Sequence, residues 1–90
     1  MKAAMSDEWT VNPLRKFLWK LSNDLKSEDV EGLTYLAELG DAVAEGCKKG
    51  IHVFKELQRL ARIKPDNLEC LKELMRDIDR HDLVARIGNY

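Results

Sequence analysis

The chain has 90 residues, of which 44% are hydrophobic and 34% are charged, and its formal net charge is -1 at pH 7. This length allows one small domain, and the composition argues against intrinsic disorder and against a membrane-spanning segment. The near balance of basic and acidic residues also differs from a nucleic-acid-binding domain, which usually carries a basic excess or a basic stripe.

The first eleven residues are predicted to lie outside the folded domain. Residues 1–11 have no apolar region typical of a signal peptide, and we interpret them as a loosely attached N-terminal arm, with Trp9 as a candidate contact to the body. The domain itself is expected over residues 12–90. Its first helix should begin at Asn12 and Pro13, because Asn is a favoured N-cap and Pro is favoured at the first helical position.

Apolar residues at helical spacing then define the helices in chain order. The first stripe consists of Leu14, Phe17, Leu18, Leu21 and Leu25. Ser27 is expected to cap a second helix that Gly40 ends. The inner face of that helix is expected to hold Val30, Leu33, Leu36 and Ala37.

Four more helices are expected after Gly40. A weak third helix covers residues 41–47, and a fourth runs over 51–62 until Pro65 interrupts the pattern. Asp66 and Glu69 have the spacing of a capping box for a fifth helix through Ile78, and Asp79 can cap the last one. Six short helices predict an all-α fold, a compact helical bundle rather than a long four-helix one.

Neither metal binding nor catalysis is indicated. Cys47 and His52, like Cys70 and His81, do not have the spacing of a zinc site. The sequence has no glycine-rich phosphate loop, no nucleophile elbow and no cysteine beside an evident base. We therefore expect no catalytic residue, no metal, no cofactor and no small-molecule substrate, and two free thiols typical of the cytoplasm or nucleus.

Two aromatic residues fall away from the apolar stripes. At 100° per residue, Tyr35 lies about 160° from Leu33, and Trp19 lies about 120° or more from the mean direction of the leucines of its helix. Exposed aromatic residues are favoured anchors of protein interfaces. The alternative is that a neighbouring helix or the N-terminal arm covers each ring.

An acidic residue at the edge of the second stripe also needs a partner. Asp29 lies about 40° from Leu33, where a carboxylate is partly desolvated and favours a nearby cation. Arg80 could bind Asp29 and Asp82 together through its planar guanidinium. In the alternative interpretation, Asp79 and Asp82 simply cap the last helix.

These residues together resemble the death effector domain family. Asp29 followed by Arg80, His81, Asp82 and Leu83 is similar to the family's charge triad, an acid on the second helix with an Arg-x-Asp-Leu string at the sixth. The similarity extends from residue 12 to residue 87. It implies the death fold, an antiparallel six-helix bundle.

The resemblance also implies a function and a binding surface. Family members are non-catalytic modules that bind one another and stack into filaments that gather initiator procaspases. Tyr35 and Leu36 stand where the family has a Phe-Leu pair, and the partner face is expected on the first and fourth helices with Trp19. Tyr35 departs from the family's Phe, so its hydroxyl needs water or a hydrogen-bond partner.

Expected partners are therefore the chain itself and other death effector domain proteins, namely adaptors, initiator procaspases and inhibitors. No membrane or nucleic-acid partner is expected. Two alternatives remain open. One is another death-fold adaptor of innate immune signalling. The other is a helical nucleic-acid-binding domain, for which the basic residues of the fourth helix region, Arg59, Arg62 and Lys64, are few beside so many acidic ones.

Overall fold

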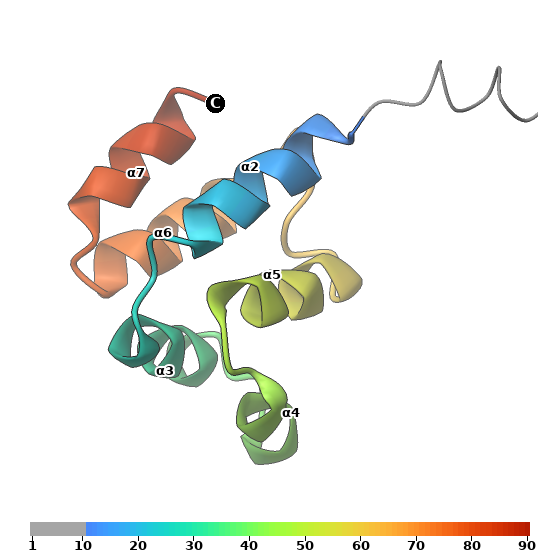
Figure 1. Ribbon diagram of the computed structural model, residues 1–90, viewed down its shortest axis with the longest axis vertical. Coiled ribbons are helices and arrows are strands. Elements are labelled where there is room, and N and C mark those ends of the chain that lie inside the picture. Colours follow the sequence, from blue (N-terminus) through green and yellow to red (C-terminus); the bar gives the residue numbers. More distant parts are fainter. Residues whose placement is uncertain (1–10) are drawn as a thin grey trace, which may run out of the picture.

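The computed structural model describes residues 11–90, so residues 1–10 of the expected N-terminal arm, Trp9 among them, lie outside the described residues. Within this range the chain forms six helices and no strand longer than one isolated bridge, and the all-α fold is confirmed. The helices are α2 (Pro13–Ser22), α3 (Ser27–Leu36), α4 (Asp41–Gly46), α5 (Gly50–Arg59), α6 (Glu69–Asp77) and α7 (His81–Gly88) (Figure 1). None of these helices has the length and apolar character needed to cross a membrane.

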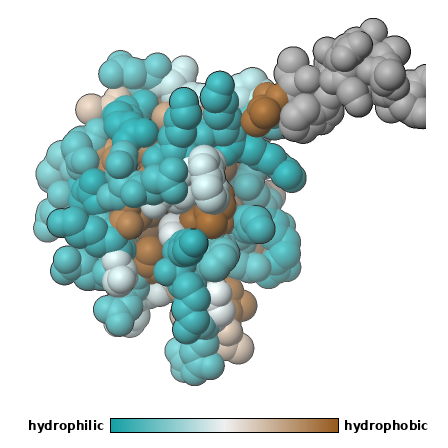
Figure 2. Space-filling view, in the orientation of Figure 1, coloured by the Kyte–Doolittle hydropathy of each residue, from teal (hydrophilic) through white to brown (hydrophobic). Residues whose placement is uncertain are grey.

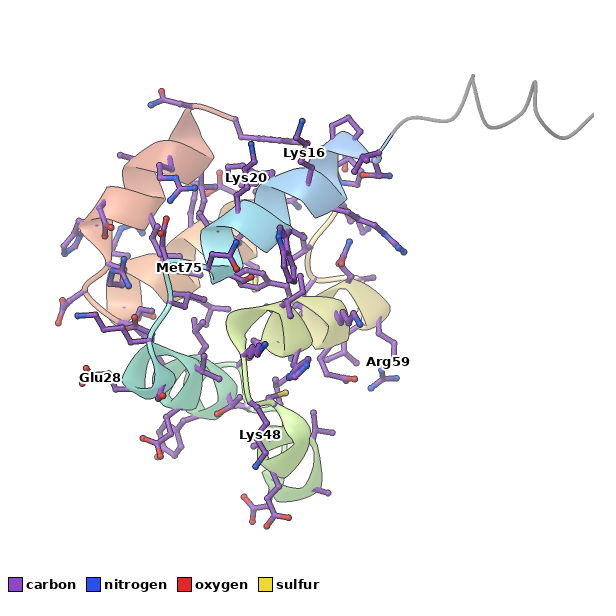
Figure 3. All side chains as sticks on the ribbon, viewed as in Figure 1. Lys16, Lys20, Glu28, Lys48, Arg59 and Met75 are labelled. Atoms are coloured by element: carbon purple, nitrogen blue, oxygen red, sulfur yellow. The ribbon has the colours of Figure 1, made fainter. Side chains whose placement is uncertain are left out.

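The apolar stripes meet in one core. Both α2 and α3 pack against α5, and α6 pairs with α7. Met75 of α6 is fully buried and lies among the helices (Figure 3). Burial of each such side chain contributes about 1.5–3 kcal/mol to folding. The other fully buried large side chains are Leu18, Leu21, Leu33, Val53, Phe54, Leu57, Leu71 and Leu83.

Helix α4 takes little part in this core. It has no buried residue and projects from the end of the bundle beyond α3 and α5 (Figure 1). The weak third helix expected from the sequence therefore exists, but its neighbours stabilise it through few contacts.

The start of α2 is as predicted, whereas the start of α3 is not. The side-chain oxygen of Asn12 accepts a hydrogen bond from the backbone N–H of Leu14 at 2.9 Å. Ser27, by contrast, is already inside α3, and Lys26 occupies the N-cap position. The capping bond runs backwards, from the Lys26 N–H to Asp29 Oδ2 at 2.9 Å. Asp29 therefore replaces the serine as the residue that satisfies this helix end.

The caps predicted for α6 and α7 are also wrong. Asn67, not Asp66, accepts the bond from the Glu69 N–H, at 3.1 Å. Asp79 adopts the left-handed conformation with φ of 61°, and Arg80 occupies the N-cap position of α7. A residue in this conformation serves the turn that follows α6, so it cannot cap the next helix.

Two helices end earlier than the sequence suggested. Helix α3 ends at Leu36, where Glu38 turns the chain with φ of 55°. Gly40, expected to end this helix, has φ of 88° and precedes α4 instead. Helix α5 ends at Arg59, and Ala61 takes φ of 61°. Non-glycine residues in left-handed turns cannot be read from a periodic pattern.

Candidate functional site

Arg80 joins α3 to the start of α7. Its Nη1 lies 2.7 Å from Asp29 Oδ2. Its Nη2 and Nε lie 2.9 Å and 3.1 Å from the two carboxylate oxygens of Asp82. The structure thus brings together the three charged residues singled out in the sequence. These contacts match the bridging interpretation, in which the guanidinium binds two carboxylates at once.

The members of this triad differ in burial. The side chain of Asp29 is 11% exposed and that of Arg80 is 21% exposed, whereas that of Asp82 is 62% exposed. Arg80 also donates to the backbone oxygen of Asp24 at 2.9 Å. Leu83, the last residue of the string, is fully buried in the core. The buried pair therefore lies directly beside the leucine that anchors α7.

The ion pairs shift two pKa values in opposite directions. The hydrogen bond to Asp82 raises the pKa of Arg80, the bond to Asp29 adds to this effect, and partial burial works against it. The same hydrogen bond from Arg80 lowers the pKa of Asp82. Both groups therefore stay charged throughout the physiological pH range.

A second ion pair beside the triad was missed in the sequence. Arg86 of α7 donates to Asp24 in the turn between α2 and α3. Together with the bond from Arg80 to the Asp24 carbonyl, it fastens α7 to this turn twice. The available signal was spacing, because Arg86 follows Asp82 by four residues and lies on the same side of the helix.

The surface around Tyr35 is exposed and acidic. Tyr35 is 83% exposed, so no neighbouring helix covers its ring. Leu36 was expected in the core but is 40% exposed, because α3 ends there and Ala37 takes the buried place. A shallow depression of about 760 Å³ lies between α3 and α4. We call this surface the tyrosine face; it comprises Glu31, Tyr35, Leu36, Glu38 and Asp41.

A groove lies elsewhere on the molecule, between α2 and α5. Leu18, Trp19 and Ile51 form its apolar floor, and it has a volume of about 580 Å³. Trp19 is 52% exposed, so the described residues leave half of it open to solvent. Figure 2 shows hydrophobic residues between these two helices, on a face that is mostly hydrophilic but has further hydrophobic spots. We call this feature the α2–α5 groove.

The rim of the groove is basic. It consists of Arg15, Lys55, Gln58 and Arg59. Arg59 is paired with Glu56 at 2.7 Å, and this hydrogen bond lowers the pKa of Glu56. The three basic rim residues come from two helices that are far apart in the sequence, so they do not form a basic stripe along the chain.

The two surfaces belong to segments of opposite charge. Residues 27–47 contain no Lys or Arg, and residues 48–64 contain one acidic residue, Glu56. Figure 3 shows Glu28 on α3, Lys48 in the connection between α4 and α5, and Arg59 at the end of α5. The acidic residues of the first segment are Glu28, Asp29, Glu31, Glu38, Asp41 and Glu45. The basic residues of the second are Lys48, Lys49, Lys55, Arg59, Arg62 and Lys64.

One further bond connects the two surfaces. Arg62, just after α5, donates from Nη1 to the backbone oxygen of Ala37 at 2.7 Å. Ala37 follows the last residue of α3, where carbonyl groups lack partners within the helix. The helix that carries Tyr35 is therefore fixed to the end of the helix that lines the groove.

Cys47 lies in an environment that does not favour reactivity. Partial burial raises the pKa of the Cys47 thiol, and the carboxylate of Glu56 raises it further. This favours the thiol over the reactive thiolate. Over residues 11–90, no group of three or more His, Cys, Asp or Glu side chains is placed to hold a metal ion.

Six short helices around one core, with an acid of α3 bound to an arginine before α7, define the death-fold class of helical domains. The family model of the death effector domain matches residues 14–90, and the chain belongs to this family. Death effector domains are non-catalytic protein-interaction modules. The FAS-associated death domain protein of Homo sapiens is 27% identical over 82 residues, which cover 89% of this chain and 39% of that protein. No solved structure matches the chain.

Proposed function

We propose that this domain joins death effector domain proteins head to tail, with the tyrosine face of one copy docked in the α2–α5 groove of the next. The observation that carries the proposal is that one domain has two separate surfaces of opposite charge, each with a large exposed aromatic residue. Charge complementarity selects and orients partners, and aromatic anchors supply most of the affinity.

Docking of two different faces leaves one face free at each end, so copies can be added without limit unless the rotation closes a ring. The net charge of -1 gives little repulsion between copies. We infer that the domain forms filaments that recruit adaptors, initiator procaspases and inhibitors of the same family during apoptosis signalling in the cytoplasm. Its family, and its similarity to the FAS-associated protein, support this role.

In the proposed assembly the charge triad acts as a positioning device. Arg80 holds the start of α3 through Asp29 at 2.7 Å, and Tyr35 lies near the other end of the same helix. Loss of the triad would loosen α3 and tilt the tyrosine face. The triad would therefore support binding without touching the partner.

The test uses two variants that each retain one surface. Tyr35→Asp should remove the tyrosine face, and Lys55→Glu should reverse a charge in the groove. Sedimentation velocity and negative-stain imaging over a concentration series should show growing oligomers for the unmodified chain and monomers for each variant. Mixing the two variants should give a 1:1 dimer, because each offers the surface that the other lacks.

The control is Lys64→Glu, which changes the charge of an exposed lysine outside the groove and should leave assembly intact. A mixture that stays monomeric would contradict docking between the two faces. The groove, with Trp19 and basic residues, also resembles a site for single-stranded nucleic acid. Strong retention on heparin at low salt, lost steeply as salt rises, would favour that function instead.

A further inference from the structure

Tyr35 presents a polar group at the point where an interface anchor is expected. The residue is 83% exposed, so in a single copy its hydroxyl is hydrated. Docking in the α2–α5 groove would remove that water. A buried hydroxyl without a hydrogen-bond partner opposes binding, whereas one with a partner adds specificity.

The rim of the groove offers such a partner. Arg15 and Lys55 are cations that can face the carboxylates of the tyrosine face, whereas Arg59 is already paired with Glu56. The remaining rim residue is the neutral Gln58. Its amide can both donate and accept, so it can serve a phenol without leaving a charge unpaired.

The position of Gln58 suits this role. Ile51, Lys55 and Gln58 are spaced by four and three residues along α5, so they lie on one side of the helix. Gln58 is therefore on the same side of α5 as Ile51, within the groove where a docked ring would lie. Gln58 is only half-buried, which leaves its amide accessible to a second copy.

We infer that the hydroxyl of Tyr35 is a specificity-determining group that hydrogen-bonds the side-chain amide of Gln58 in the groove of the next copy. This inference rests on the proposed function and adds to it. The apolar floor alone would accept any aromatic ring, whereas the amide distinguishes tyrosine from phenylalanine. The chain would thus favour its own copies over domains that carry a phenylalanine at this position.

The experiment is a double-mutant cycle on the 1:1 dimer formed by the two variants that each retain one binding surface. The donor copy carries Lys55→Glu and keeps its tyrosine face. The acceptor copy carries Tyr35→Asp and keeps its groove. Tyr35→Phe is introduced in the donor and Gln58→Leu in the acceptor, and the Kd is measured by isothermal titration calorimetry. Each change should weaken the dimer about fivefold to tenfold, as expected for the loss of one hydrogen bond.

The two changes combined should weaken the dimer no more than either one alone, because both remove the same bond. If Tyr35→Phe binds like the unmodified donor, the hydroxyl has no role and the inference fails, while the dimer itself upholds the proposed function. If both single changes weaken binding but their effects multiply, Gln58 is not the partner. Lys64→Gln in the acceptor should change nothing.

Discussion

Replacing Arg80 by alanine tests how much the charge triad contributes to the free energy of unfolding. The change removes one hydrogen bond from Asp29 and two from Asp82, along with the bond to the backbone oxygen of Asp24. Asp82 is mostly exposed and can be hydrated again. Asp29 cannot be hydrated in the same way, because its side chain is 11% exposed. Without Arg80, its carboxylate keeps only the hydrogen bond from the Lys26 N–H.

The loss is therefore concentrated on Asp29. Leaving a buried charged group without its partner costs about 1–3 kcal/mol, so Arg80→Ala should lower the free energy of unfolding by about 2–3 kcal/mol. Asp29→Asn should cost about 1 kcal/mol, since the amide can still accept a hydrogen bond. In the double variant, Asp29→Asn with Arg80→Ala, the side chain at position 29 is a neutral amide, so the loss of the guanidinium leaves no buried charge unpaired. The combined loss should be smaller than the sum of the single losses by at least about 0.5 kcal/mol.

Urea unfolding at pH 7, followed by circular dichroism, measures all three variants. The matched control is Arg76→Ala, because Arg76 forms a 3.6 Å pair with Glu73 in which both side chains are at least half exposed. This control should change the free energy of unfolding by less than about 0.5 kcal/mol. If Arg80→Ala costs no more than the control, and the two triad changes are strictly additive, the reasoning is refuted.

Two further predictions concern pH and close packing. Arg80 lowers the pKa of Asp82 in the folded state, so the contribution of Asp82 to stability is present at neutral pH and is lost as the pH falls below roughly 4. Asp82→Asn should therefore flatten this part of a plot of urea midpoint against pH. An unchanged plot would contradict the prediction. Gly50→Ala should lower the melting temperature despite its better helix propensity, because the added Cβ would lie 3.2 Å from the Ser22 Cα and 3.1 Å from the Ser22 Cβ, as well as 2.5 Å from Leu25 Cδ1. Gly46→Ala is the control, since nothing lies within 4 Å of its added Cβ, and it should leave the melting temperature unchanged or raise it. Equal melting temperatures for both alanine variants would show that the chain accommodates the contact.

Much of the fold could be predicted because the apolar residues repeat with helical spacing. In the first stripe, Leu14, Leu18 and Leu21 are buried as expected, and Phe17 is half-buried. The contact of Asp29 with Arg80 was also within reach, because a carboxylate at the edge of an apolar stripe needs a cation. Such predictions succeed where a local need, such as a cation for a partly buried carboxylate, can be met by few residues in the chain.

Other features depend on geometry that the sequence does not carry. The caps were assigned to Ser27 and Asp79 on preference alone, but the backbone conformation at the helix ends decides which side chain reaches a free N–H. The exposure of Leu36 depends on where α3 stops. The basic groove arises only when α2 packs on α5, which brings Arg15 beside Lys55.

The bond from Arg62 to the carbonyl of Ala37 has a consequence for the shape of an assembly. Helix α3 carries the surface that a domain offers, and α5 lines the groove that receives it. In the proposed assembly, this bond would set the angle between successive copies by tying one helix to the other. That angle would be repeated at every step, so a single fold would determine the curvature and pitch of the row. A small deviation in one domain would be multiplied along the row, and a chain without the bond would then build shorter and less regular rows.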